Sequence, residues 1–313
     1  DVVATFISSG LGEDQVYLEV PEGFDCPPGY VLHLNPAVEG LKQASAKWTK
    51  KIDGISTTKG LEPVAKGTET CQYCKRVDEI PCLVAQYVDD FGTRVHPSQY
   101  HLYEEIIEAK EATGLELHRL GRLVGQKILG IRVQAKDGSK NLVLDQHEYI
   151  QATVDKFAEA KEHEPVDTPM DPNLDLFDED SPLLETPTAY QSLIGALIWL
   201  TCCTAPILSI SVNRLAQFMA APRELHWSAA IKVLACAHQH LNELQLEIGG
   251  GGLELRGYAD ADFAKDADRK SVSDYVFFIG FTTLSWASKK QKNVVLNNTH
   301  AEHDALVLSA IRW

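Results

Sequence analysis

Two adjacent aspartates, Asp89 and Asp90, follow a run of apolar residues at the expected end of a strand. Two carboxylates in this position repel each other unless a divalent cation lies between them, so the pair indicates a metal site built from oxygen ligands. The alternative is an acidic turn in solvent. Asp1 leads a stretch rich in β-branched residues and could supply a third carboxylate that bridges two metal ions.

Cysteines and histidines suggest weaker metal sites. Cys71 and Cys74 form a C-x-x-C pair, which is half of a zinc site, but the other cysteines offer no second pair and are expected in strands or in the core. His300 and His303 could suggest a metal pair on a helix, but we do not expect one there. The chain has 7 cysteines, an odd number that argues against a disulfide framework and for a reducing compartment.

A hairpin should position the aspartate pair. The stretches 71–77 and 82–88 are typical of paired strands, and the second runs directly into Asp89. Apolar residues at helical spacing predict a helix over 41–55 with lysines on its opposite face, and another over 97–113.

The rest of the chain alternates between strand-like and helical segments. An acidic, proline-rich stretch over 162–187 predicts a linker or an exposed loop, and the glycine run 249–252 predicts a hinge or a hairpin turn. The other expected elements are strands at 1–7, at 15–20 and within 128–144, a helix at 148–160, helices from 190 to 244, strands from 253 to 287 and a helix from 299 onward.

Composition sets limits on partners. The chain has 313 residues, enough for about two domains, and 44% of them are hydrophobic, which is typical of a folded protein. A net charge of −15 argues against extensive nucleic-acid binding, because neutralising phosphates supplies most of that affinity. Two local basic clusters remain: Lys42, Lys47, Lys50 and Lys51, and further on Lys289, Lys290 and Lys292.

The sequence does not predict a membrane protein. The longest apolar candidate, 193–203, is shorter than the roughly 18 to 20 residues that span a bilayer. The chain opens with Asp1 rather than Met and has no basic and then apolar leader, so we expect a piece of a longer protein without a signal peptide.

Many sequence blocks match one family in order along nearly the whole chain. They are DVVATF, VYLEVPEGF, EGLKQASAKW, YVDD, LGIRV, LDQHEYI, PVDTPM, YQSLIGALIWL, YADADFA, RKSVSDYVFF, LSWASKKQ and THAEHDAL. Together they resemble the Pol polyprotein of copia-type long-terminal-repeat retrotransposons, in its reverse transcriptase and ribonuclease H region.

The resemblance assigns a role to each candidate residue of the polymerase. It implies that Asp1, Asp89 and Asp90 hold two Mg²⁺ ions, with Mn²⁺ as a substitute, for nucleotidyl transfer to the 3′-hydroxyl of a primer. Phe6 would lie beneath the sugar of the incoming nucleotide and favour deoxynucleotides, or would simply be a core aromatic. The implied nucleotide and template pocket also includes Gly40, Lys42, Gln43 and Tyr87.

In the C-terminal part, Asp260 and Glu302 match catalytic carboxylates of ribonuclease H, and Asp262 is auxiliary. The implied fold is α+β: a reverse-transcriptase palm with an antiparallel sheet and helices over 1–145, a helical thumb and connection over 146–250, and the N-terminal part of a ribonuclease-H-like domain over 251–313. The implied partners are an RNA template, a DNA primer or RNA:DNA hybrid, and deoxynucleoside triphosphates, with no membrane and no small-molecule cofactor. The implied location is intracellular, in a cytoplasmic virus-like particle with passage to the nucleus.

Several positions depart from the family pattern: Glu39 replaces tyrosine, Ser45 and Ala46 replace Pro-Arg, 204–208 lacks an Arg and an Asp, Asp274 replaces glycine and His300 replaces glutamate. Two functions therefore stay open, an RNA-directed DNA polymerase with a truncated ribonuclease H, or an inactive remnant that at most binds nucleic acid or protein. The family places a fingers segment before its first motif and further acidic residues after a segment like 311–313. We therefore expect this chain alone to be inactive in both reactions.

Overall fold

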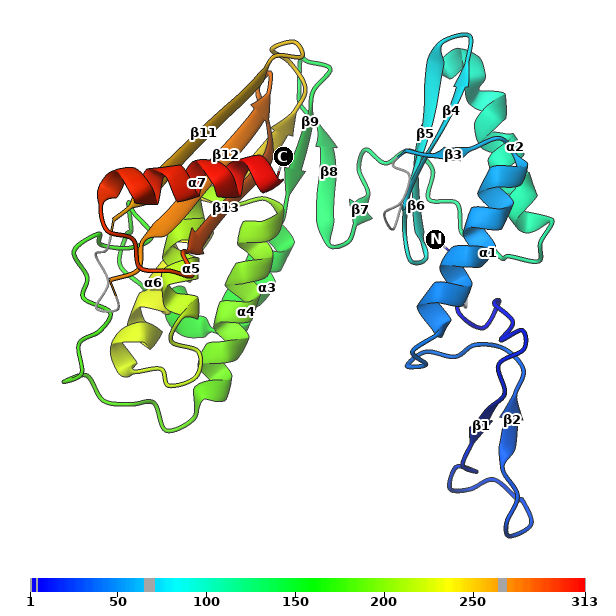
Figure 1. The fold of residues 1–313 in the computed structure, drawn as a ribbon, viewed down its shortest axis with the longest axis horizontal. Coiled ribbons are helices and arrows are strands. Elements are labelled where there is room, and N and C mark those ends of the chain that lie inside the picture. Colours follow the sequence, from blue (N-terminus) through cyan, green and yellow to red (C-terminus); the bar gives the residue numbers. More distant parts are fainter. Residues whose placement is uncertain (1, 4, 65–70, 264–268, 313) are drawn as a thin grey trace. The chain divides into compact units, whose positions relative to one another are not determined.

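The computed structural model describes residues 2–3, 5–64, 71–263 and 269–312, and every strand pair in these ranges is antiparallel. Helices accompany the sheets along the whole chain, so the fold is α+β (Figure 1). The chain divides into a first unit that ends at Leu123 and a second unit that begins at Val124. Within the described ranges, no helix combines the length and the apolar character that crossing a bilayer needs.

The first unit contains a four-stranded sheet in the order β3-β4-β5-β6. Its central hairpin forms as predicted, because Tyr73, Cys82 and Val84 alternate toward one face and are buried there. The strands are β3 (Glu62–Pro63), β4 (Gln72–Val77), β5 (Ile80–Tyr87) and β6 (Asp90–Arg94).

Two helices pack in the first unit, and both were predicted within a few residues. They are α1 (Ala44–Thr58) and α2 (Tyr100–Glu111), the second preceded by a 3₁₀ turn at Pro97–Gln99. Leu102 and Ile106 of α2 pack against the buried side chains of the sheet. Trp48 and Ile52 of α1 form a separate cluster with Val2 and Leu115.

The prediction of a strand over 1–7 is wrong for the described residues. Val2 forms a single bridge to Leu117, and residues 5–8 lie in turns. The Thr5 hydroxyl donates to the carbonyl of Val2 at 3.1 Å, and the Ser8 hydroxyl donates to that of Thr5 at 2.7 Å. Such local side-chain bonds to the backbone compete with strand pairing. The next strand, β1 (Val16–Leu18), pairs with β2 (Leu32–Leu34).

The second unit begins with a sheet whose order is β10-β9-β8-β7. Its strands are β7 (Lys127–Ile128), β8 (Ile131–Ala135), β9 (Leu142–Asp145) and β10 (Gln245–Ile248). The predicted hairpin of β8 and β9 forms, but β9 also pairs with β10, about a hundred residues further on. The division between the two units falls before this hairpin, between Leu123 and Val124. The expected extent of the palm, 1–145, stays a prediction.

Helices α3 to α6 build the main core of the second unit. Their bounds are α3 (His147–Lys156), α4 (Pro187–Cys203), α5 (Ser209–Ala216) and α6 (Glu224–Gln239), with 3₁₀ turns at Ala158–Ala160 and Pro206–Leu208. The segment 162–187 has no helix or strand before α4 begins at Pro187, as predicted for a loop. It is not a free linker, because Val166, Met170 and Leu176 are buried in this core.

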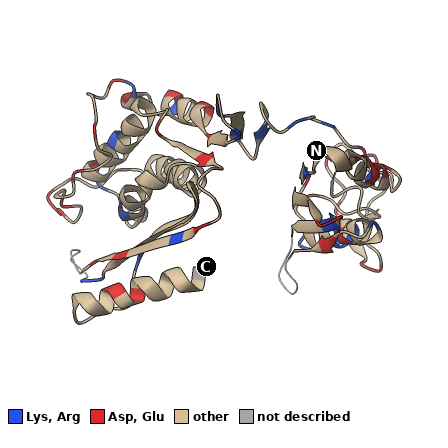
Figure 2. Ribbon diagram, turned by 90° about the horizontal axis from the view of Figure 1, so that it is seen from above, with Lys and Arg blue, Asp and Glu red and all other residues tan. Residues whose placement is uncertain are grey.

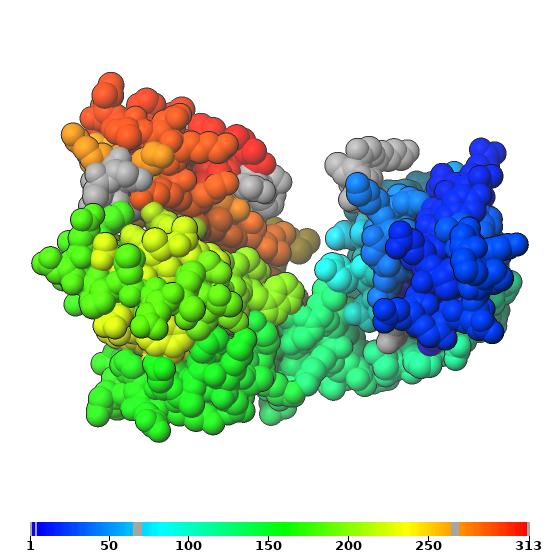
Figure 3. Space-filling model, turned by 90° about the horizontal axis from the view of Figure 1, so that it is seen from below, coloured from blue at the N-terminus to red at the C-terminus, as the bar shows by residue number. Residues whose placement is uncertain are grey.

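The C-terminal part is a three-stranded sheet covered by a helix. The elements are β11 (Leu255–Asp262), β12 (Val272–Ile279), β13 (Thr282–Lys290) and α7 (Asn298–Arg312). On one face, Ala261 packs under Ala301 and Ala305 of α7. On the other, the indole of Trp286 donates to the carbonyl of Thr201 in α4 at 2.7 Å. Figure 3 shows this part in orange to red against the helices of the same unit in green to yellow.

Candidate functional site

The predicted aspartate pair lies at the tip of the hairpin formed by β5 and β6. Tyr87 pairs with Asp90, so Val88 and Asp89 are the two turn residues between the strands. Val88 has a φ of 51°, a left-handed conformation that is unfavourable for a β-branched residue. Its carbonyl accepts a hydrogen bond of 2.7 Å from the indole N–H of Trp48 in α1. Contacts from outside the hairpin thus hold a turn that its own sequence disfavours.

Both aspartates of the turn are half-buried, and Tyr87 beside them is exposed. Neither carboxylate forms an ion pair with any residue in the described ranges. In the part of the chain that the structure describes, no cationic side chain therefore neutralises them. This arrangement leaves their oxygen atoms available to a divalent cation.

The start of the chain lies against the same turn. The backbone N–H of Val2 donates to the carbonyl of Asp89 at 3.0 Å, and that of Val3 donates to the carbonyl of Glu116 at 3.0 Å. Asp1 itself lies outside the described residues. Among the residues that are described, no three His, Cys, Asp or Glu side chains come together as a metal site.

Phe6 and the residues before α1 were predicted to form the nucleotide pocket. Phe6 is half-buried and packs against two clusters, one containing Trp48 and the other Leu11 and Ala44. This packing agrees with its alternative role as a core aromatic, and a role beneath a nucleotide sugar stays a prediction. Gly40 has a φ of 87°, Lys42 is exposed, and Gln43 is at the N-cap of α1 without a capping side-chain bond.

The basic clusters are smaller in the structure than in the sequence. Lys47 forms a 2.8 Å ion pair with Asp14, and the Lys51 amine donates to the carbonyl of Ser8 at 2.6 Å. Burial lowers the pKa of Lys51 below its usual value. Lys290 donates to the side chain of Gln217 at 2.7 Å. Lys and Arg are interspersed with Asp and Glu along the chain (Figure 2). Three lysines of the two clusters, at 47, 51 and 290, thus already contact other groups of the protein.

Asp260 and Glu302 arise from opposite sides of the C-terminal sheet. Ala261 faces α7, so strand alternation places Asp260 on the face toward α4 and α5, whereas Glu302 is carried by α7. Asp274 lies directly across from Asp260 in the neighbouring strand. Burial, and to a lesser degree the charges of Asp260 and Asp262, raise the pKa of Asp274. The ribonuclease H roles of Asp260 and Glu302 stay predictions.

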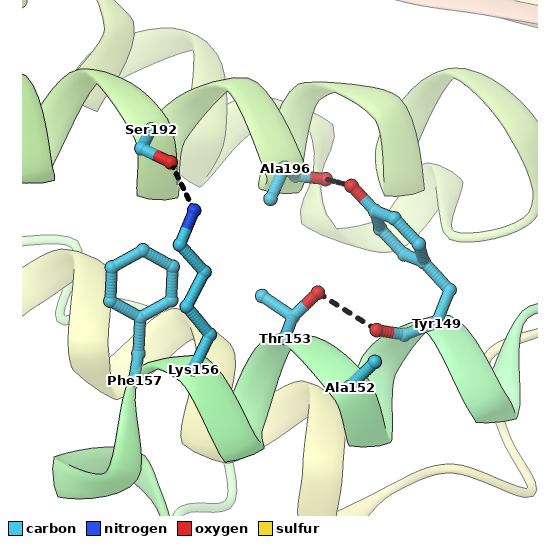
Figure 4. Close-up of a pocket in the computed structure, with 7 residues that line it drawn as sticks. All are labelled: Tyr149, Ala152, Thr153, Lys156, Phe157, Ser192 and Ala196. Atoms are coloured by element: carbon cyan, nitrogen blue, oxygen red, sulfur yellow. Dashed lines mark hydrogen bonds between the residues drawn. The ribbon is translucent and has the colours of Figure 1, made fainter.

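Two of the hollows that the described residues form lie in the second unit, and neither contains the hairpin aspartates. One of about 330 Å³ lies between the segment 206–210 and the face of the sheet that carries Asp260 and Asp274. The other, of about 300 Å³, lies between α3 and α4, where the Lys156 amine donates to the Ser192 hydroxyl at 2.7 Å (Figure 4). Its other lining groups are Tyr149, Ala152, Thr153, Phe157 and Ala196, so it presents no pair of carboxylates.

Two residues near the hairpin were not predicted to matter for the site. Trp48 was expected only as part of the apolar face of its helix, and its N–H donor to Val88 follows from no local pattern. Lys110 of α2 is 1% exposed, and its amine lies 3.1 Å above the centre of the Phe91 ring. Burial lowers the pKa of Lys110 to about 7. A lysine within the helical pattern would normally be assigned to the solvent face, so the sequence carries no signal for this contact.

Comparisons with known proteins fit this arrangement. Residues 1–172 match the model of the family described as reverse transcriptase (RNA-dependent DNA polymerase). The chain is 31% identical to the retrovirus-related Pol polyprotein from transposon TNT 1-94 of Nicotiana tabacum, over 97% of this chain and 23% of the relative. It is 32% identical to the corresponding polyprotein from transposon RE1 of Arabidopsis thaliana, over 100% of this chain and 21% of the relative.

The share of each relative's length that this chain covers differs from one relative to another. A transposon Ty5-1 protein of Saccharomyces cerevisiae is 29% identical over 97% of this chain and 96% of its own length. The two plant polyproteins are several times longer than the part that matches. The chain spans between a fifth and a quarter of their length.

The class of protein follows from two findings. The hairpin carries Tyr-Val-Asp-Asp at its tip, and the family model matches the α+β unit that contains it. The chain belongs to the reverse transcriptase (RNA-dependent DNA polymerase) family. Within it, the relatives that match along the whole chain place it in the reverse transcriptase region of a copia-type retrotransposon Pol polyprotein.

Proposed function

We propose that Asp1, Asp89 and Asp90 form the metal centre of an RNA-directed DNA polymerase that extends a DNA primer with deoxynucleoside triphosphates. One observation carries the proposal: the N–H of Val2 donates to the carbonyl of Asp89 at the tip of the hairpin. The residue that follows Asp1 is therefore bonded to the turn that carries the other two carboxylates. Sequence motifs nearly ninety residues apart meet in one place.

The donor set fits a hard divalent cation. Carboxylate oxygens are the ligands that Mg²⁺ prefers, and Mn²⁺ accepts the same donors. Two half-buried carboxylates on one turn are too few for two ions, and Asp1 would add the third. When bound, the metal ions would lower the pKa of the primer hydroxyl and balance the charge of the triphosphate. The protein holds the carboxylates in fixed positions through the packed hairpin.

The surrounding residues are proposed to bind the substrates. Gly40, Lys42 and Gln43 lie just before α1, and the exposed amine of Lys42 would meet a phosphate of the incoming nucleotide. Tyr87 is also exposed beside the carboxylates and offers a ring surface to a template or primer. Phe6 would face the sugar only if it turned part of its ring away from the two clusters that it contacts.

We further propose that the first unit contains the palm, that α3 to α6 serve as thumb and connection, and that β11 to α7 begin a ribonuclease-H-like domain. The last assignment is supported by a three-stranded antiparallel sheet followed by a helix packed on its face. Asp260 and Glu302 would then act on the RNA strand of a hybrid. We also propose that the protein acts on nucleic acid inside a cytoplasmic virus-like particle, as the family resemblance implies.

The polymerase proposal is tested by primer extension on an RNA template with Mg²⁺, with the fingers segment of a copia-type relative supplied. Asp89→Asn keeps the size of the side chain and removes one negative ligand, so extension should fall to background. Asp78→Asn is the matched control, because Asp78 lies in the turn at the other end of β5. Extension above background that is equal in Asp89→Asn and the unaltered chain would reject Asp89 as a ligand. No extension by the unaltered chain would instead favour the inactive remnant.

A further inference from the structure

We propose that Trp48 is a positioning residue that sets the orientation of the hairpin turn and thereby of the carboxylates of Asp89 and Asp90. The inference rests on the proposed polymerase site and adds to it a residue that touches neither metal nor substrate. Trp48 would act through the backbone of the turn.

The donor is held firmly by its surroundings. Trp48 is 2% exposed and packs with Val2, Ile52 and Leu115. Its indole N–H lies 2.7 Å from the carbonyl oxygen of Val88, a short and direct hydrogen bond. A second donor to the same oxygen, the side-chain amide of Gln86, is 3.4 Å away and contributes less. Trp48 is therefore the main partner of this carbonyl.

Both peptide planes next to Asp89 are fixed from outside the hairpin. The plane before it contains the carbonyl of Val88, which Trp48 holds. The plane after it contains the carbonyl of Asp89, which accepts from the N–H of Val2. The Cα of Asp89 lies between these planes, and the second plane leads directly into Asp90. Holding the two carbonyls thus fixes the directions in which both carboxylates leave the backbone.

The turn needs this support because its own conformation is unfavourable. A φ of 51° at a β-branched residue costs on the order of 1–3 kcal/mol and persists only where neighbouring groups impose it. Without the indole N–H, the Val88 carbonyl would lose its main partner and the peptide could rotate toward a relaxed conformation. Shifts of about 1 Å at a catalytic centre can cost ~100-fold in rate.

The test removes the donor and keeps the aromatic packing. Trp48→Phe is compared with Trp227→Phe, the matched control, because Trp227 also donates its indole N–H, to a carboxylate oxygen of Glu159 at 2.8 Å, but lies in α6 of the second unit. Mn²⁺ binding by the purified chain is followed through the electron paramagnetic resonance signal of free Mn²⁺. We expect Trp48→Phe to weaken binding by about fivefold or more, the equivalent of one lost hydrogen bond, and Trp227→Phe to leave it unchanged.

A rescue separates positioning from general loss of structure. Asn tolerates the left-handed region better than Val, so Val88→Asn added to Trp48→Phe should recover part of the lost Mn²⁺ affinity. Unchanged Mn²⁺ affinity in Trp48→Phe would overturn the inference. Asp89→Asn serves as the reference: if it also leaves Mn²⁺ binding unchanged, the proposed metal centre itself is wrong, which is a different failure.

The unaltered chain provides a measurement that does not depend on a variant folding. In a Mg²⁺ titration followed by ¹H–¹⁵N spectra, the indole signal of Trp48 should shift as the turn binds the ion, and the signal of Trp227 should stay in place. A Trp48 signal that does not move at saturating Mg²⁺ would contradict the coupling between the indole and the carboxylates.

Discussion

The two units differ in how their hydrophobic cores are divided. In the described part of the first unit, the buried apolar residues fall into separate small clusters, whereas α3 to α6 of the second unit share one extended cluster. The candidate polymerase site lies where the small clusters meet, since Phe91 packs against two of them and Phe6 also against two. Several small clusters can therefore support the site from different sides. Each cluster contains few contacts, so losing one contact removes a large share of that support.

A buried base in each unit shows the same difference. His226 in the second unit is 1% exposed, and both of its ring nitrogens have partners: Nδ1 accepts from the N–H of Arg223 and Nε2 donates to the carbonyl of Leu176, each at 2.8 Å. Lys110 in the first unit is equally buried and meets the face of Phe91. In the continuous core, both ring nitrogens of the buried base therefore have hydrogen-bond partners. In the divided core, the buried amine meets an aromatic ring, so its burial costs more free energy of folding.

The largest effect is expected from a cavity in the continuous core. Leu197 is 1% exposed in α4, and Leu197→Ala should lower the free energy of unfolding of the second unit by about 2–5 kcal/mol. Hydrogen exchange resolved by peptide measures each unit separately. Peptides of the first unit should keep their protection against hydrogen exchange. Equal loss of protection in both units would contradict the view that the two cores are stabilised separately.

The next effect is a gain from replacing the buried lysine. Burial lowers the pKa of Lys110 to about 7, so between pH 7 and its ordinary value near 10.5 the unfolded chain binds the extra proton and stability rises with pH. The slope is at most about 1.4 kcal/mol per pH unit. Lys110→Met should stabilise the first unit by about 2 kcal/mol at pH 7 and flatten this slope, although it gives up the contact with the Phe91 ring.

Denaturation of the first unit at pH 7 and pH 9 checks this expectation. Lys75→Met is the control, since Lys75 lies in β4 of the same sheet and is not buried. A variant at position 110 that is less stable than the unaltered chain at pH 7 would show that the ring contact outweighs the cost of burial.

The smallest effect concerns the buried histidine. Burial, opposed in part by the bond to Leu176, lowers the pKa of His226 below its ordinary value. Below about pH 6.5 the unfolded chain therefore binds a proton that the folded chain resists, so the second unit should lose stability as the pH falls. His226→Phe removes this dependence and both ring hydrogen bonds, with a cost of about 1–2 kcal/mol at pH 7. Unfolding curves at pH 7 and pH 5 compare the two, and an unchanged acid dependence in the variant would assign it to another group.

Local patterns predicted most elements of the fold. The hairpin of β4 and β5, the helices α1 and α3 to α6 and the C-terminal sheet followed their apolar periodicity and turn residues. The sequence could not show that β9 pairs with β10, because such pairing depends on contacts between distant residues. The sequence also gave no sign that Val166 and Leu176 anchor the acidic loop in the core. Nor did it show that residues 5–8 would form turns held by hydroxyl-to-backbone hydrogen bonds instead of a strand.

The candidate site divides in the same way. Asp89 and Asp90 were predicted at a strand end and are found there, because a two-residue turn is a local feature. The groups that hold the turn come from α1 and from the start of the chain, which only the tertiary structure brings together. The metal and substrate roles of these residues stay predictions that the experiments above address.

The pairing of β9 with β10 also sets an order of events during translation. All residues of the first unit have been synthesised once residue 123 is made, whereas β9 ends at Asp145 and its partner β10 ends only at Ile248. At ~5–20 residues per second, the ribosome needs roughly 5–21 s to pass from Asp145 to Ile248. During that interval the nascent chain carries one edge of β9 without its partner, and an open strand edge is a template for wrong pairing. Chaperone binding or pausing during synthesis would therefore matter most while α3 to α6 are being made.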